Sequence, residues 1–107
     1  MAGEGIKLLT DASFEKEIKE GVTLVDFYAD WCGPCRMLAP VLEKVAKDVK
    51  GKAQVAKLDV DSAQRVASSF QVTSIPTLIL FQNGKEVGRI VGLKDAETLK
   101  QFILAKT

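Results

Sequence analysis

The segment Val22–Ala29 constrains the fold more than any other part of the chain, because branched and aromatic side chains fill almost all of its positions. Asp26, in the middle, is its one charged residue. A strand with one face in water alternates apolar and polar residues, whereas a run that is apolar on both faces is typical of a central parallel strand covered on both sides. The segment therefore predicts an α/β architecture.

Four further strands and four helices are expected from periodicity and turn residues. The strands are expected at residues 6–9, 53–60, 77–81 and 86–91, with the hairpin turn Asn83-Gly84 between the last two. The helices are expected after an N-cap at Asp11, from the cysteines to Val49, at residues 62–70, and after an N-cap at Asp95. Pro40 should kink the second helix. This order describes one α/β domain over residues 1–107, a mixed five-stranded sheet flanked by four helices.

Charge and composition exclude several classes of partner. The 15 basic and 14 acidic residues are scattered without runs, so no field attracts nucleic acid or an anionic membrane surface. The N-terminus lacks the basic start and apolar core of a secretory signal, and the apolar runs are too short to span a bilayer. We therefore expect a cytoplasmic protein.

Both cysteines lie in the pentapeptide Trp31-Cys32-Gly33-Pro34-Cys35, and three kinds of site are conceivable for them. A structural zinc site needs four ligands from Cys and His, but the chain has two cysteines and no histidine. A structural disulfide across so short a loop removes only roughly 2 kcal/mol of chain entropy, against about 4–5 kcal/mol for a loop of ~100 residues. A pair that opens and closes in redox chemistry is favoured over both.

The expected position of the pair at a helix N-terminus supports redox chemistry. Free backbone N–H groups and the helix dipole favour a thiolate there by roughly 0.3–2 kcal/mol. Cys32, at the cap, should be the exposed nucleophile, and Cys35, one turn into the helix, should be more buried and resolve the mixed disulfide.

The pentapeptide, together with Asp26, Ile75-Pro76-Thr77, Asn83-Gly84 and Gly92, resembles the thioredoxin family from end to end of the chain. A bare Cys-x-x-Cys would be weak evidence, but this set in this order is highly specific. The resemblance implies the thioredoxin fold and a dithiol that reduces protein disulfides without a bound cofactor or metal. It also implies disulfide-containing protein substrates, re-reduction by a thioredoxin reductase, and a monomer.

The resemblance also implies roles for three residues beside the cysteines. Asp26 matches a buried carboxylate that exchanges a proton with Cys35, and a carboxyl in an apolar strand is expected to titrate near neutrality. Lys57 matches a lysine near that carboxylate, and Pro76 matches a cis-proline that faces the disulfide. The alternatives are that Asp26 faces a polar gap at the end of the sheet and that Lys57 is a surface lysine at a strand end.

A substrate-docking surface around the sulfurs is implied in the same way. Its members share small or apolar side chains, and they are Trp31, Gly33, Pro34, Val60, Ile75, Pro76, Val91 and Gly92. Ordinary core packing is the alternative for Val60 and Val91, and a simple turn is the alternative for Gly92. Tyr28 departs from the family pattern, because relatives often carry tryptophan at its position.

Two rival functions remain open from the sequence. An oxidase or isomerase of an exported compartment is disfavoured, because oxidising relatives usually carry a histidine between the cysteines, where this chain has Gly33-Pro34. A non-catalytic binding module with the same fold would act without its sulfurs.

Overall fold

The computed structural model describes residues 5–107, which form five strands and four helices. The expected domain, 1–107, includes residues 1–4, which lie outside the described part. In chain order the elements are β1 Ile6–Leu9, α1 Phe14–Ile18, β2 Val22–Tyr28, α2 Gly33–Asp48, β3 Gln54–Asp59, α3 Gln64–Ser69, β4 Thr77–Gln82, β5 Lys85–Val91 and α4 Ala96–Leu104. The predicted order of elements is confirmed.

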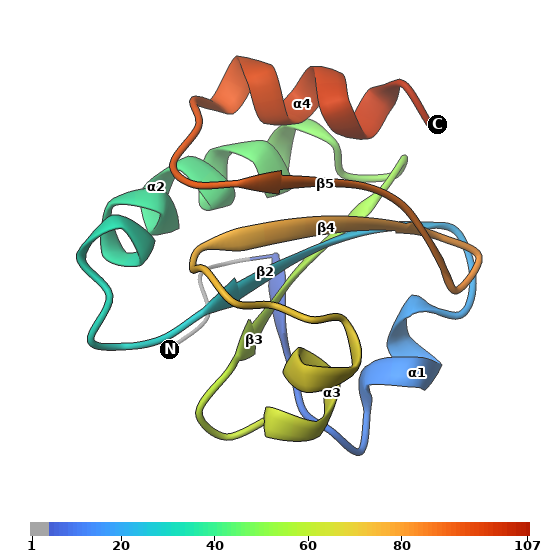
Figure 1. Cartoon of the computed structure of the whole chain (residues 1–107). Helices are drawn as coiled ribbons and strands as arrows, with labels where there is room; N and C mark the ends of the chain where they lie inside the picture. The colour runs from blue at the N-terminus through green and yellow to red at the C-terminus, as the bar shows by residue number, and fades with distance from the viewer. Residues whose placement is uncertain (1–4) are drawn as a thin grey trace.

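The five strands form one mixed sheet in the order β1-β3-β2-β4-β5. β1, β3 and β2 run parallel, whereas β4 is antiparallel to β2 and β5 is antiparallel to β4. Figure 1 shows α2 and α4 on one face of the sheet and α1 and α3 on the other. The predicted α/β class, with helices on both faces of a mixed sheet, is therefore confirmed.

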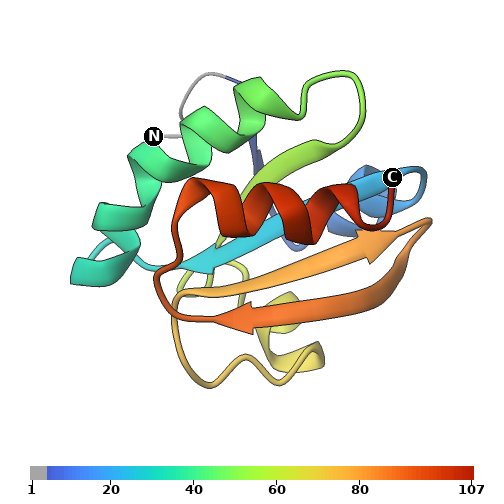
Figure 2. The ribbon, with the colours of Figure 1, turned by 90° about the horizontal axis from the view of Figure 1, so that it is seen from above.

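The central strand β2 is buried at all seven positions, as its apolar sequence predicts. Alternate side chains of β2 enter two different cores. Leu24 packs with Leu38 and Leu42 of α2 and with Leu99 of α4, and Figure 2 shows these two helices side by side over the sheet. On the other face, the cluster around β2 is completed by side chains of α1 and α3, which include Phe14, Ile18, Val66 and Ala67.

The predicted hairpin turn and the predicted N-cap of the last helix are both present. Asn83 and Gly84 both have positive φ, at 51° and 87°, which is the backbone that a two-residue hairpin turn between twisted strands requires. The Asp95 side chain accepts a hydrogen bond from the N–H of Thr98 and so caps α4, as predicted. α2 continues through Pro40. Within residues 5–107, no helix has the length and apolar character that crossing a bilayer demands.

The prediction that Asp11 caps the first helix is wrong. α1 has Ser13 at its N-cap position, without a side-chain capping bond. The Asp11 carboxylate instead accepts hydrogen bonds from the N–H groups of Arg65 and Val66, at 3.3 and 3.0 Å, in the first turn of α3. α3 needs this distant cap because its own N-cap residue is Ala63, which has no side-chain acceptor.

We expect Asp11→Ala to lower the free energy of unfolding by about 1 kcal/mol, because two N–H groups at the start of α3 lose their acceptor. Asp11→Asn keeps one acceptor oxygen and should cost less. Urea denaturation at neutral pH measures both values. A variant Asp11→Ala that is as stable as the parent chain would show that the contact contributes nothing to the fold.

Candidate functional site

The site is built where the central strand β2 leads into α2. Cys32 is the N-cap residue of α2, with extended backbone, and Cys35 lies in the first helical turn. The two residues form a disulfide, with their Cα atoms 5.2 Å apart. The backbone N–H of Cys35 points at the Cys32 sulfur, at 3.2 Å. The predicted position of the pair at a helix N-terminus is therefore confirmed, and one N–H of that terminus is directed at Cys32 Sγ.

The expected difference in exposure between the two cysteines is wrong for the disulfide form. Cys32 is 5% exposed and Cys35 is 3% exposed, so both are buried. Cys32 is covered because Ile75, from the loop before β4, packs on the cluster that holds both sulfurs, and the Ile75 carbonyl oxygen lies 3.9 Å from Cys32 Sγ. The two cysteines differ in their position in the helix rather than in burial.

Asp26 lies in the middle of the sheet rather than at a polar gap at its end. It is paired in register with Lys57 of β3 on one side and Leu78 of β4 on the other, and it is fully buried. Neither carboxylate oxygen has a hydrogen-bond partner among residues 5–107. Burial raises the pKa of Asp26 from its ordinary value of 3.8 to about 7, and the nearby Lys57 charge opposes part of this rise.

Lys57 is not a surface lysine, since only 8% of the residue is exposed. Its ammonium nitrogen lies 4.4 Å from the centre of the Tyr28 ring. Both residues line a small cavity of about 210 Å³, and Cys35 and Arg36 also contribute to its wall. The structure therefore brings Asp26, Lys57 and Cys35 into one region on the α2 face of the sheet.

The Ile75–Pro76 peptide bond is cis, as the resemblance implies. Pro76 is buried, and its carbonyl oxygen accepts a hydrogen bond from the Gly92 N–H at 2.8 Å. Gly92 has φ +98°, a backbone conformation that favours glycine. Gly92 is therefore more than a simple turn residue, because it links the end of β5 to the proline beside the disulfide.

The predicted docking surface is part exposed and part packed. Trp31 is 68% exposed and Val91 is 53% exposed, so core packing does not account for Val91. Val60 and Ile75 are partly exposed and pack against the buried cluster of Tyr28, Ala29 and the two cysteines. Pro34 is exposed, and Gly33 and Gly92 are partly exposed.

Asp61 is a contact residue that the sequence analysis missed. Its carboxylate accepts a hydrogen bond from the indole N–H of Trp31 at 2.9 Å. Asp61 follows the carboxyl end of β3, and Trp31 follows the carboxyl end of the neighbouring parallel strand β2. The rule that such ends meet at one edge of a sheet was the signal available in the sequence.

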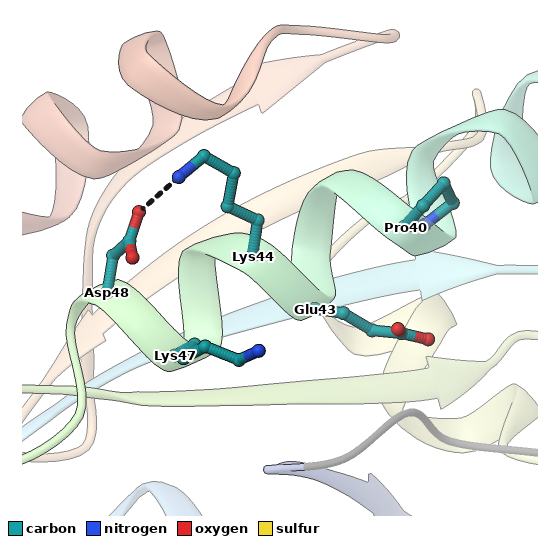
Figure 3. A pocket seen from close by; sticks show the side chains of 5 residues that line it. All are labelled: Pro40, Glu43, Lys44, Lys47 and Asp48. Atoms are coloured by element: carbon teal, nitrogen blue, oxygen red, sulfur yellow. Dashed lines mark hydrogen bonds and ion pairs between the residues drawn. The ribbon is translucent and has the colours of Figure 1, made fainter.

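A second hollow, of about 510 Å³, lies on the outer face of α2 and does not reach the sulfurs. Figure 3 shows its walls, which are Pro40, Glu43, Lys44, Lys47 and Asp48, with an ion pair between Lys44 and Asp48. Its charged side chains are exposed, so none of them is fixed in a buried position as catalytic groups usually are. Across residues 5–107, no three His, Cys, Asp or Glu side chains are grouped to hold a metal ion.

Comparison with known proteins agrees with this geometry. Residues 5–105 match the family model described as Thioredoxin. The chain is 50% identical over 95 residues to a thioredoxin of Staphylococcus aureus (strain Mu50 / ATCC 700699), an alignment that covers 89% of this chain and 91% of the relative. It is 52% identical over 95 residues, with the same coverage, to a thioredoxin of Staphylococcus saprophyticus. The chain therefore belongs to the thioredoxin family of protein-disulfide oxidoreductases, and Cys32 and Cys35 are its redox-active pair.

Proposed function

We propose that Cys32 is the attacking thiol and Cys35 the resolving thiol of this oxidoreductase. The N–H of Cys35 that points at Cys32 Sγ supports this assignment, because the same donor would stabilise a Cys32 thiolate once the disulfide is open. Cys32 Sγ lies beside the Ile75 carbonyl oxygen of the cis-proline loop, whereas Cys35 lies inside the first helical turn and lines the cavity beside Lys57. An incoming disulfide therefore meets Cys32 first.

The proposed cycle is a balanced two-electron exchange. The Cys32 thiolate attacks one sulfur of a substrate disulfide, forming a mixed disulfide and releasing the other substrate sulfur as a thiolate, which takes up a proton. The Cys35 thiol then loses its proton and attacks Cys32 Sγ, which releases the second substrate thiol. The substrate gains two electrons and two protons, and the chain is left with the Cys32–Cys35 disulfide.

We propose that Asp26 accepts the proton of Cys35 in the second step and that Lys57 supports its ionised form. A carboxyl with a pKa of about 7 can both accept and release a proton near neutral pH. Its burial without hydrogen bonds costs stability, and a functional role would account for why the chain carries it.

The substrate is proposed to lie along the cis-proline loop as an extended segment. Ile75, whose carbonyl lies near Cys32 Sγ, would offer backbone hydrogen bonds, and Pro76 would fix the direction of that loop. The exposed surface around it would contact substrate side chains without selecting one sequence, and it comprises Trp31, Gly33, Pro34, Val60, Val91 and Gly92.

We further propose a thioredoxin reductase as electron donor, because each cycle ends with a disulfide and the exchange itself supplies no electrons to reopen it. A cytoplasmic location follows from the need for a reducing compartment. We propose that residues 1–107 act as one domain and as a monomer, and the family match over residues 5–105 supports the first of these points.

Exchange through the two sulfurs predicts different effects for the two cysteine variants. Cys32→Ser should abolish reduction of insulin by dithiothreitol above the rate without protein, whereas Cys35→Ser should accumulate a mixed disulfide with the substrate. Turbidity measures the first, and intact-protein mass spectrometry measures the second. If Cys32→Ser kept the full effect, the chain would be acting as a non-catalytic binding module.

For Asp26→Asn we expect slower resolution of the mixed disulfide near pH 7, by roughly a hundredfold, because the general base is lost. The attack by Cys32 should change little. Stopped-flow measurement of Trp31 fluorescence, with formation and decay of the mixed disulfide fitted separately, distinguishes the two steps. Equal decay rates for variant and parent from pH 6 to pH 9 would dismiss the proton-transfer role.

The same substitution should change how stability depends on pH. Because the folded-state pKa of Asp26 is raised, the folded chain binds more protons than the unfolded chain between about pH 4 and pH 7, so the Asp26 contribution falls as pH rises through this window. Asp26→Asn removes this loss and should be more stable than the parent by roughly 2–4 kcal/mol at pH 8. The gain should shrink towards zero near pH 4 in urea denaturation series.

The Trp31–Asp61 bond is expected to hold the indole in place for docking. Asp61→Ala should raise KM for a protein disulfide by about 2–10-fold with little change in kcat, since a contact worth roughly 0.5–1.5 kcal/mol is lost. Asp61→Asn keeps an acceptor oxygen and is the matched control. Trp31 is the only tryptophan, so its emission reports the change directly, and an unaltered spectrum in Asp61→Ala would contradict the contact.

A further inference from the structure

Tyr28 lies between the proton-handling residues and the sulfurs. It is the last residue of β2, two positions after Asp26, so both side chains point to the same face of the sheet. The Tyr28 ring packs with Ala29, Cys32 and Cys35 in one buried cluster. The resemblance gave this position no role in the reaction.

The Tyr28 ring also contacts the Lys57 ammonium. Only 8% of Lys57 is exposed, and within residues 5–107 the Asp26 carboxylate accepts no hydrogen bond from its ammonium. Its nitrogen lies 4.4 Å from the ring centre, well within the range of a cation–π interaction, which strengthens as the cation is shielded from water. The ring is therefore in direct contact with this charge.

The cavity beside the ring offers the ammonium an alternative position. The space of about 210 Å³ is lined by Lys57, Tyr28, Cys35 and Arg36 among others. A lysine has a flexible four-carbon stem and a strongly hydrated head, so without an attractive ring it would turn towards water in this space. Its distance from Asp26, its register partner on β2, would then increase.

We propose that Tyr28 is a positioning residue for the resolving step, whose ring holds the Lys57 ammonium next to Asp26 and thereby keeps Asp26 ready to accept the Cys35 proton. This proposal rests on the role proposed above for Asp26. Three further charged groups lie around Tyr28, Lys57 and Asp26, and they are Asp30 after β2, Asp59 on β3 and Arg36 on α2. The neighbour of Asp26 on β4 is the apolar Leu78.

The ring, and not the hydroxyl group, carries this role. Burial raises the pKa of Tyr28 above its ordinary value of 10, and the carboxylates of Asp59, Asp30 and Asp26 raise it further. The phenol therefore stays neutral at any pH at which the exchange runs, and it cannot be the proton acceptor. Tyr28→Phe, which keeps the ring face, is consequently the matched control.

The test is the titration of Asp26 in the disulfide form, followed by ¹³C NMR of its carboxyl carbon. Because the Lys57 charge lowers the pKa of Asp26, Tyr28→Leu should move the midpoint upward by about 0.3–1 pH unit, whereas Tyr28→Phe should leave it in place. The rate of mixed-disulfide resolution at pH 7 should fall by up to about fivefold in Tyr28→Leu, in step with the smaller ionised fraction.

A double-mutant cycle with Lys57→Met isolates the contact between the Tyr28 ring and the Lys57 ammonium. Once the ammonium is absent, Tyr28→Leu should cause no further shift of the Asp26 titration midpoint. Tyr28→pentafluorophenylalanine keeps the shape of the ring but reverses its quadrupole, so it should act like Tyr28→Leu without disturbing packing. An unchanged midpoint in this variant, or an equal shift in the Lys57→Met background, would overturn the proposal. A shifted midpoint with an unchanged resolving rate would instead overturn the proposed role of Asp26.

Discussion

Burial of β2 on both faces is the constraint on which the fold and the site both depend. The strand supplies side chains to the two cores that join α2 and α4 to one face of the sheet and α1 and α3 to the other. The same burial removes Asp26 from water and raises its pKa to about 7. The central strand thus contributes apolar side chains that stabilise both cores and also holds a buried carboxyl that lowers the stability of the folded chain.

The sulfurs make use of a second property of the fold. A short segment joins the carboxyl end of β2 to α2, so Cys32 lies at the start of α2, where the first N–H groups of the helix have no partner within the helix. The cis-proline loop before β4 reaches the same end of the sheet because β4 runs antiparallel to β2 and begins opposite the carboxyl end of β2. Residues more than forty positions apart therefore enclose one disulfide.

Most of the fold could be predicted, because each helix, strand and turn depends on the periodicity and turn residues of its own segment. The predictions that failed concern contacts between residues far apart in the sequence. Asp11 caps a helix that begins more than fifty residues later, and Cys32 is covered by Ile75 from another loop. The sequence shows what such side chains can do but not which partner lies opposite. The Trp31–Asp61 bond was missed for the same reason, although the parallel strands before them gave a usable hint.

The register of the strands, rather than proximity in sequence, determines which charged groups lie near Asp26. Asp26 and Lys57 are partners across β2 and β3, and Tyr28 is the next residue on the same face. A one-residue slip would turn Lys57 to the opposite face and leave the buried carboxyl without its lysine partner. Because the register is set by the apolar residues on both faces of β2, the packing of the core decides the electrostatics of the site. The same register places Tyr28 on the face of Asp26, where its side chain packs against both the Lys57 ammonium and the cysteines.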